Sequence, residues 1–400
     1  MNLTLCTIVK NEEATLLRTL DSVKGVVDDI VVVDTGSGDR TREIARDFGA
    51  RVYEFEWCDD FAAARNESLK HAQGDWILVL DADEVLVPEI VPQMLLAIKS
   101  DRLLLINLIR QEIGASQSPY SLVSRLFRNR PAIRFSRPYH AMVDDSVAEI
   151  LQREPQWKIA SLPDVAILHS GYHKDAIAAK GKFQKAQAAM ERYIAYYPND
   201  AYACSKLGAL YVESGQLGRG INLLTKGLTA VAIDDSIVYE LNYHLGIAYR
   251  QQQQFTKAKE HYQAAINTNV FPALKLGAYN NLGNLLKDEG DLQSAEKAYK
   301  AALKIDPNFA AGHYNLGLTL KAAGNLADAI AYYRQAIKID PEQAEYHQNL
   351  AVALLKIGKM PESLAEFKRA IALHEHRRPF EAERLRRGLQ EMGLIDFLQK

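Results

Sequence analysis

The segment WILVLDADE, Trp76–Glu84, places five apolar residues directly before a group of acidic ones. A short apolar run that follows a turn predicts a strand buried on both faces, as in a parallel sheet. Asp81, Asp83 and Glu84 then lie together just beyond the end of that strand. Clustered carboxylates are costly unless a positive group meets them, so the segment predicts a binding site as well as a strand.

The residues before this segment alternate between strand and helix patterns. Apolar runs rich in β-branched residues predict strands, and apolar residues at helical spacing predict helices. The expected strands are 3–9, 30–33, 51–55 and 76–80, and the expected helices are 12–23, 39–49 and 61–72. This order is typical of parallel strands covered by helices. Ligands bind such sheets beyond the carboxyl ends of the strands, where the acidic segment lies.

The pattern becomes less regular after Pro92. Three further segments read as strands, at 103–109, 121–127 and 165–168. The connections between them are rich in Gly, Ser, Pro and Arg, which are residues of turns and loops. We therefore expect a mixed extension of the sheet, joined by long loops.

The second half of the chain, from about Tyr172, is helical and repeats itself. Small residues recur, each followed after 16 residues by a large apolar or aromatic residue and after 19 by Gly or Ala. The three sets are Gly208, Gly246, Gly283, Gly317 and Ala351; Leu224, Tyr262, Tyr299, Tyr333 and Phe367; and Gly227, Ala265, Ala302, Ala336 and Ala370. A small residue lets one helix approach the next, and the large side chain fills the space beside it. The spacing resembles the tetratricopeptide repeat.

This resemblance implies an all-α solenoid of about five repeats over residues 201–373. Residues 173–200 are expected to form a helical bridge, and 374–400 a capping helix. Stacked helix pairs present a long concave groove that suits an extended peptide or a partner protein. We expect the repeats to recruit a polypeptide, with self-association into a homo-oligomer as the alternative.

The composition is that of an ordinary globular protein of two or three domains. The 400 residues are 48% hydrophobic and 24% charged, and the net charge of −2 gives no general attraction to nucleic acid. No apolar run approaches the roughly 20 residues that span a bilayer, and the first residues lack a signal-peptide pattern. Cys6, Cys58 and Cys204 fit neither a disulfide framework nor a zinc site. We therefore expect a cytoplasmic protein with no transmembrane segment and no nucleic-acid partner.

Asp81 and Asp83 are one residue apart, on a tight turn after a strand. Two such carboxylates can face one hard cation, and Mg²⁺ or Mn²⁺ prefers carboxylates, water and phosphate oxygens. A divalent ion that bridges a diphosphate would explain why the acids cluster. The alternative is an exposed acidic turn before Pro88.

Neighbouring strand ends carry polar residues as well. In VVVDTGSGDRT, Val31–Thr41, Asp34 ends a strand, and the glycines after it allow the backbone to approach a ligand closely. VKNEE, Val9–Glu13, ends the first strand, and FAAARNES, Phe61–Ser68, carries Arg65 on the helix before the acidic segment. An arginine there can neutralise a phosphate or order the loop.

Together these motifs, in this order, resemble the family 2 glycosyltransferases over residues 1–172. The resemblance implies the GT-A fold, a Rossmann-like α/β domain with a mixed sheet. It implies a hexosyltransferase-type reaction, in which a sugar moves from a nucleotide sugar to an acceptor, usually with inversion and with Mn²⁺ or Mg²⁺.

The resemblance also implies roles for individual residues. Asp34 would bind the base, typically uracil, and Arg65 would lie near the nucleotide; turn formation and a surface ion pair are the respective alternatives. Asp81 would contact ribose or water bound at the metal site, and Asp83 would hold the metal. The remaining residues implied to bind the nucleotide sugar are Thr7, Val9, Asn11, Glu12, Gly36, Ser37 and Ala82.

Two later segments, SRLFRNRPAIRFSRPYHAMVDDSV at 124–147 and AILHSGYH at 166–173, resemble a subgroup that joins this domain to tetratricopeptide repeats. The first segment usually ends in His-Glu, but Ala141 follows His140 here. His169 either completes the metal site with Asp81 and Asp83, since a neutral imidazole binds Mn²⁺, or has a structural role.

A hydroxyl acceptor needs a general base within hydrogen-bonding reach. Asp144 is favoured and His140 is next, with Asp145 and Glu112 as further candidates. A thiol acceptor would need less help from a base. The loss of the Glu after His140 leaves a non-catalytic repeat scaffold with a degenerate transferase domain as the main alternative. A haloacid dehalogenase-type phosphatase and a sugar nucleotidyltransferase fit the motif order less well.

Overall fold

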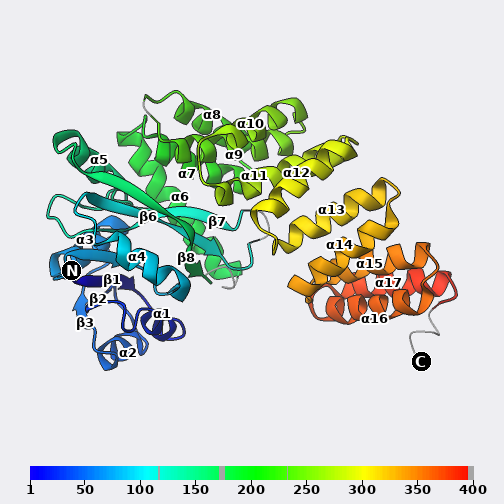
Figure 1. The fold of residues 1–400 in the computed structure, drawn as a ribbon, viewed down its shortest axis with the longest axis horizontal. Helices are drawn as coiled ribbons and strands as arrows, with labels where there is room; N and C mark the ends of the chain where they lie inside the picture. Colours follow the sequence, from blue (N-terminus) through cyan, green and yellow to red (C-terminus); the bar gives the residue numbers. More distant parts are fainter. Residues whose placement is uncertain (116–117, 171–175, 232, 395–400) are drawn as a thin grey trace. The chain divides into compact units, whose positions relative to one another are not determined.

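The computed structural model describes residues 1–115, 118–170, 176–231 and 233–394. The chain forms two compact units, Met1–Ala248 and Tyr249–Lys400, which are described separately below (Figure 1). The GYH part of the second subgroup segment, up to His173, and the end of the predicted cap fall wholly or partly outside the described residues.

The first unit contains one sheet of eight strands in the order β3-β2-β1-β4-β7-β6-β8-β5. The strands are β1 Leu3–Val9, β2 Asp29–Asp34, β3 Arg51–Glu54, β4 Trp76–Val79, β5 Glu84–Leu86, β6 Leu103–Glu112, β7 Tyr120–Arg128 and β8 Lys158–His169. β1 to β4 are parallel, and β7 then pairs antiparallel with β4. The predicted parallel half and its mixed extension are both confirmed.

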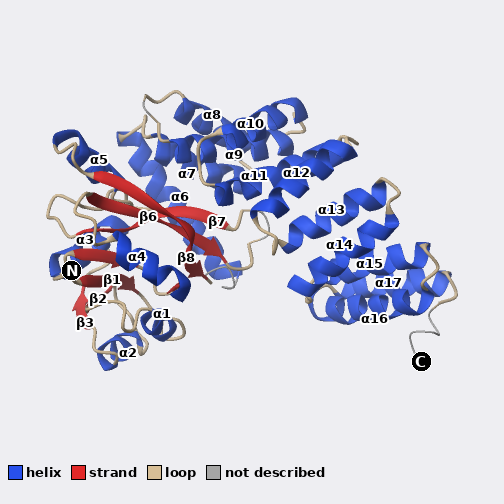
Figure 2. Ribbon diagram, viewed as in Figure 1, coloured by secondary structure: helices blue, strands red, loops and turns tan. Residues whose placement is uncertain are grey.

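Helices cover both faces of this sheet (Figure 2). They are α1 Leu16–Ser22, α2 Thr41–Asp47, α3 Phe61–His71, α4 Val91–Ala97 and α5 Asp144–Arg153. Side chains of β4 alternate between two cores: Trp76 and Leu78 pack with α1, α2 and α4, whereas Ile77 and Val79 pack with α3 and α5. Strands buried on both faces explain the continuous apolar runs in the sequence.

Several elements differ from the prediction. β8 begins at Lys158, well before the predicted 165, because it pairs in parallel with most of β6. β5, α4 and α5 were not predicted. α1 begins at Leu16 rather than at Glu12, whose carbonyl accepts a turn hydrogen bond from the N–H of Thr15 at 3.1 Å.

Helices follow the sheet within the first unit. α6, Ala176–Tyr196, occupies the segment predicted as a bridge, and α7 Ala201–Glu213, α8 Leu217–Leu228 and the greater part of α9 Asp235–Gln251 come next. Met190 of α6 packs with Leu207 and Tyr211 of α7, and Tyr139 from a loop of the sheet domain joins this cluster. The first helices therefore pack onto the sheet domain, and the compact unit extends beyond residue 172.

The described part of the second unit consists of helices apart from short turns. They are α10 Phe255–Asn267, α11 Leu276–Asp288, α12 Leu292–Ile305, α13 Ala310–Ala322, α14 Leu326–Ile339, α15 Ala344–Lys356, α16 Met360–Arg377 and α17 Pro379–Glu391. A Cβ added to Gly283 would lie 2.6 Å from Cε1 of Tyr299, and one on Gly317 would lie 2.7 Å from Cε1 of Tyr333. The predicted contact between a small residue and the ring 16 positions later is confirmed at both sites.

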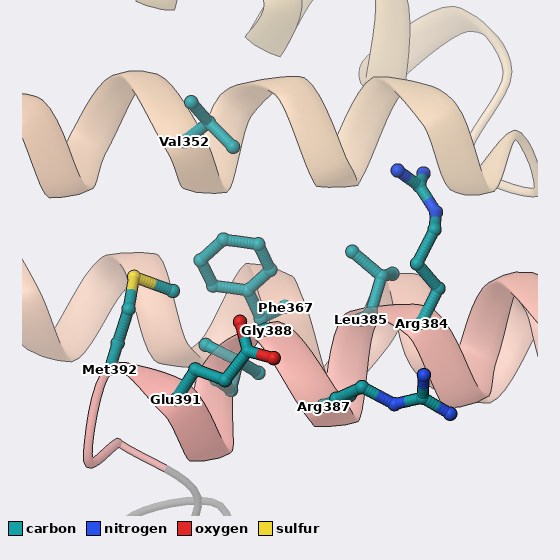
Figure 3. A pocket seen from close by; sticks show the side chains of 9 residues that line it. Val352, Phe367, Arg384, Leu385, Arg387, Gly388, Glu391 and Met392 are labelled. Carbon is teal, nitrogen blue, oxygen red and sulfur yellow. The ribbon is translucent and has the colours of Figure 1, made fainter.

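One pocket of the second unit lies between α15, α16 and α17 (Figure 3). Its lining residues are Val352, Phe367, Arg384, Leu385, Arg387, Gly388, Leu389, Glu391 and Met392. It contains none of the candidate transfer residues, which all lie in the first unit. Across the described residues, every helix is too short or too polar to cross a membrane.

Candidate functional site

The ends of β1 and β2 are tied to each other by polar contacts. The backbone N–H of Asn11 donates to Ser37 Oγ at 2.9 Å, and Asn11 Oδ1 accepts from the N–H of Gly38 at 2.8 Å. Asn11 adopts a φ of 55°, a left-handed conformation that asparagine tolerates better than most residues. The structure therefore brings together two segments that the sequence assigns to the nucleotide.

Asp34 is buried at the end of β2 and orders the loop that follows it. Its carboxylate accepts hydrogen bonds from the N–H groups of Gly36 at 3.2 Å and Ser37 at 3.0 Å. Nε of Arg42 lies 3.8 Å from the same carboxylate. Asp34 therefore has the turn-forming role that was its alternative. Its binding of the base stays a prediction.

The other residues predicted to line the nucleoside pocket have mixed surroundings. The carbonyl of Val9 accepts from both the N–H and the hydroxyl of Thr35, at 2.9 and 3.1 Å. Glu12 Oε2 accepts from the hydroxyl of Thr15 at 2.7 Å. The buried hydroxyl of Thr7 has no hydrogen-bond partner among the described residues.

Two buried arginines form ion pairs with Asp81. Nη2 of Arg65 lies 2.5 Å from Oδ1 of Asp81, and Nη2 of Arg125 lies 3.0 Å from Oδ2. Burial alone would raise the pKa of Asp81, but Arg125 and Arg65 together hold that pKa well below its usual range. Arg65 is only 6% exposed, so its pairing is not the surface ion pair considered as an alternative.

A second set of ion pairs begins at Glu84, in the same turn. Glu84 is fully buried and pairs with Nη1 of Arg110 at 3.0 Å, and Nη2 of Arg110 pairs with Glu112 at 2.8 Å. The carboxylate of Glu112, a candidate base, is therefore already paired with Arg110. The sequence analysis missed Arg110 and Arg125; their only signal was a basic residue inside an apolar strand.

His169 lies between two carboxylates at the end of β8. Its Nε2 is 3.4 Å from Oδ2 of Asp83, and its Nδ1 hydrogen-bonds with Glu112. Burial lowers the pKa of His169, but Asp83 and Glu112 outweigh burial and raise it to about 10. The pairing of Glu84 in β5 with His169 in β8 brings the histidine to the acidic turn.

Asp83 and His169 fit a divalent cation better than Asp81 does. They present a carboxylate oxygen and an imidazole nitrogen side by side, and Mn²⁺ would have to displace the proton that Asp83 and Glu112 keep on His169. Both oxygens of Asp81 are held by arginines. No group of three or more metal-ligating side chains occurs in the described part of the chain, so a cation would also need water and donor phosphates. The Mn²⁺ or Mg²⁺ site, with Asp81, Asp83 and His169, stays a prediction.

Asp144 lies in the first turn of α5. Its Oδ1 accepts from the hydroxyl of Ser124 at 2.8 Å, and its Oδ2 has no hydrogen-bond partner in the described residues. Burial raises the pKa of Asp144 to about 6. Asp145 instead pairs with Arg137 at 2.7 Å, so the two neighbouring acids have different surroundings.

His140 lies four residues before Asp144, with a φ of 53°. His140 is an exposed residue, but desolvation of its imidazole by nearby protein groups, followed by the charge of Lys206, lowers its pKa to about 3. Lys206 belongs to α7, and Glu240 of α9 acts on the same imidazole. Sequence reasoning did not place helical residues beside the candidate base.

Two family models match the chain. Residues 4–159 match the model described as "Glycosyl transferase family 2". Residues 243–310, 280–344 and 314–380 match the model of the tetratricopeptide repeat.

Several known proteins are similar to this chain. A TPR repeat-containing protein of Synechococcus elongatus is 44% identical over 303 residues, which are 76% of this chain and 75% of that protein. An uncharacterized glycosyltransferase of Rickettsia bellii is 29% identical over 193 residues, or 46% of this chain and 65% of the relative. The crystal structure of YrrB, "a TPR protein with an unusual peptide-binding site", aligns with a TM-score of 0.40 at 18% identity, covering 50% of this chain and 100% of that one.

Proposed function

Because the chain belongs to the family 2 glycosyltransferases and joins that domain to tetratricopeptide repeats, we propose that it moves a sugar from a uridine diphosphate sugar to an acceptor hydroxyl, with inversion. One observation carries this proposal. Nε and Nη1 of Arg65 and Nη1 of Arg125 are buried without an acceptor in the described residues. Buried N–H groups left unpaired are costly, and a diphosphate supplies the missing oxygens.

The residues around this arginine pair suggest how the donor is held. Asp34 and Asn11 would bind the base and its sugar at the ends of β1 and β2. Asp83 and His169 would hold a divalent cation, which when bound neutralises charge on the diphosphate. Arg65 and Arg125, kept in place by Asp81, would stabilise the negative charge that grows on the departing diphosphate.

Asp144 is the proposed general base. With a pKa of about 6 it is ionised at neutral pH, and its Oδ2 can accept the proton of an acceptor hydroxyl. The acceptor oxygen would attack the anomeric carbon on the face opposite the diphosphate. His140, whose pKa of about 3 keeps it neutral, is the second candidate.

The metal proposal is tested by the variants Asp83→Asn and His169→Gln. Calorimetry should show Mn²⁺-dependent binding of uridine diphosphate to the natural chain. Each variant should weaken that binding by about 10- to 100-fold, because it removes one of the side chains that would hold the cation. Asp164→Asn, an exposed acid elsewhere in β8, is the matched control and should bind normally.

The same titration separates the transferase from the non-catalytic scaffold. A scaffold with a degenerate site would show no metal-dependent heat with uridine diphosphate in the natural chain. Binding that is equal in the natural chain and in both variants would place the cation elsewhere.

The repeats support a polypeptide as the acceptor or partner. Nδ2 of Asn315 in α13 donates to Oδ1 of Asn280 in α11 at 2.9 Å, and Asn349 in α15 donates to the hydroxyl of Tyr314 at 2.9 Å. These side-chain amides lie on alternate helices of the stack. An amide both donates and accepts, as a peptide backbone does. We propose that this asparagine row contacts extended polypeptide.

The double variant Asn315→Ala, Asn349→Ala tests this role. It should lower sugar transfer to a degenerate peptide library by about tenfold, since two hydrogen bonds are lost, and leave donor hydrolysis unchanged. Asn308→Ala, at an exposed loop position, is the control. If the variant instead changes the oligomeric state in gel filtration with no loss of transfer, the row serves self-association.

We also propose a cytoplasmic location. Cys6, Cys58 and Cys204 are all unpaired. Unpaired thiols are typical of reducing compartments.

A further inference from the structure

The loop that carries His140 and leads into Asp144 at the start of α5 contacts the first helix of the predicted repeats. Arg137 adopts a φ of 74°, and its guanidinium pairs with Asp145 at 2.7 Å and with Asp200, the N-cap of α7, at 2.8 Å. The same guanidinium lies 5.0 Å from the ring centre of Tyr202. The hydroxyl of Tyr202 donates to the carbonyl of His140 at 3.3 Å. Thus α7 helps to set the position of the candidate base.

A second group on the helices faces this loop. Nζ of Lys206 in α7 lies 2.7 and 2.6 Å from the two carboxylate oxygens of Glu240 in α9, and 4.9 Å from the ring centre of Tyr202. The hydroxyl of Ser205 donates to Glu240 at 3.1 Å. The side chains of Lys206 and Glu240 remain 21% and 30% exposed. The pair is therefore ordered by protein contacts but still open to a ligand.

Charged groups of the sheet domain and of the helices lie near His140. Lys206, Glu240 and Arg110 all act on the pKa of His140. Glu240 holds the pKa of Lys206 above its ordinary value despite burial, while Arg110 acts in the opposite direction. Charges from β6, the loop before α5, α7 and α9 therefore lie close enough to influence one another.

Among the described residues, the two charged side chains of α7 and α9 that act on His140 balance each other. Glu240 neutralises Lys206 through both carboxylate oxygens. Burial lowers the pKa of His244 in α9 to about 4, so that imidazole is neutral at physiological pH, like His140. What remains is a set of hydrogen-bond donors and acceptors. Such a set suits an uncharged hydroxyl compound, whereas a charged ligand would lose hydration without a counter-ion.

We propose that Lys206 and Glu240 form an acceptor subsite, which binds an uncharged hydroxyl-bearing group and orients it beside Asp144. This inference rests on the proposed transferase function. The first predicted repeat then belongs to the transfer site itself, and the later repeats alone remain for recruitment. Lys206 and Glu240 are specificity-determining residues for the acceptor rather than donor-binding residues.

Glycerol, an uncharged polyol, is the probe for this subsite. With a panel of uridine diphosphate sugars and Mn²⁺, the anomeric carbon–oxygen bond to the diphosphate breaks, and the diphosphate leaves with the electron pair. The anomeric carbon bonds to oxygen of either water or glycerol, whose proton passes to Asp144. The ratio of glycosyl-glycerol to free sugar measures the preference for the acceptor, and the sum of the two measures donor cleavage.

Lys206→Met and Glu240→Gln should each lower this ratio by about five- to tenfold, the loss of one or two hydrogen bonds, because less glycosyl-glycerol forms while free sugar is still released. The double variant Lys206→Glu, Glu240→Lys keeps an ion pair at these positions and so controls for a loss of folding. It should show the same fall in the ratio of glycosyl-glycerol to free sugar. Arg219→Met removes an ion pair at 3.1 Å between α8 and Glu191 of α6, and should leave the ratio unchanged.

Two further probes define the ligand. Sugar transfer to N-acetylserine amide in place of glycerol would identify a polypeptide hydroxyl as the acceptor. Glycerol phosphate should be used less well than glycerol. An unchanged ratio in the single and double variants, or a preference for glycerol phosphate, would overturn the subsite while the transferase function stands. If the natural chain cleaves no donor, the transferase proposal fails, and the subsite fails with it.

Discussion

Replacing Asp144 by Asn is expected to lower the rate of sugar transfer at pH 8 by about 10²- to 10⁴-fold, the usual contribution of a general base. The amide keeps the shape of the side chain and the contact with Ser124, but it cannot accept the acceptor proton. In the natural chain the rate should rise with pH through about 6, where Asp144 loses its proton. Release of uridine diphosphate, measured between pH 5 and 8, checks both statements.

The same variant should be more stable than the natural chain at pH 8. Burial raises the folded-state pKa of Asp144 from 3.8 to about 6, so the protonated form is favoured in the fold. The stability contributed by the neutral acid is present below pH 3.8 and is lost as pH rises through about 6. Asn stays neutral, so the variant should gain on the order of 2 kcal/mol at pH 8, and less at pH 5. Urea unfolding at the two pH values measures the difference.

Glu149→Gln, at an exposed position of α5, is the control for both measurements. It should alter neither the rate nor the pH profile. Full activity in the Asp144→Asn variant would contradict the assignment and transfer the role of base to His140.

Replacing Asp81 by Ala should destabilise the first unit by about 3–5 kcal/mol, because it leaves buried charges without their partner. The arginines that lose this partner, Arg65 and Arg125, are 6% and 8% exposed, and each forms an ion pair with Asp81. Chemical unfolding followed by tryptophan fluorescence measures the loss, since Trp76 lies in the strand just before Asp81.

Arg134→Met is the comparison for this experiment. It breaks an ion pair between exposed side chains, 3.5 Å from Glu149, and should change stability little. If Asp81→Ala unfolded at the same denaturant concentration as the natural chain, the arginines would not depend on Asp81. The proposal that they are held ready for a diphosphate would then lose its support.

The parallel half of the sheet was predictable from local pattern. Apolar runs such as Trp76–Leu80 predict buried strands, and parallel strands bring their carboxyl ends to one edge. That rule alone is enough to group Asp34, Asp81 and Asp83. The arginines that meet the acids were not predictable in this way. Arg110 and Arg125 come from β6 and β7, whose antiparallel pairing is not marked by any local motif.

The surroundings of the candidate base were predicted less completely. The sequence analysis did not predict a helix at Asp144, although Val147 and Ile150 follow it at the spacing of a buried helix face. The repeat spacing predicted contacts such as Gly283 with Tyr299. It did not predict that α7 packs on the loop before α5, because that contact depends on single polar residues with no periodicity.

The Arg137–Asp200 ion pair predicts where foreign repeats can be joined to this chain. A chimera that joins foreign repeats after residue 172 would remove Asp200 and Tyr202 and release the loop that leads into Asp144. A junction beyond α9 would keep those contacts together with Lys206 and Glu240. The distal helices should therefore be exchangeable without disturbing these contacts, whereas α7 to α9 should stay joined to the sheet domain.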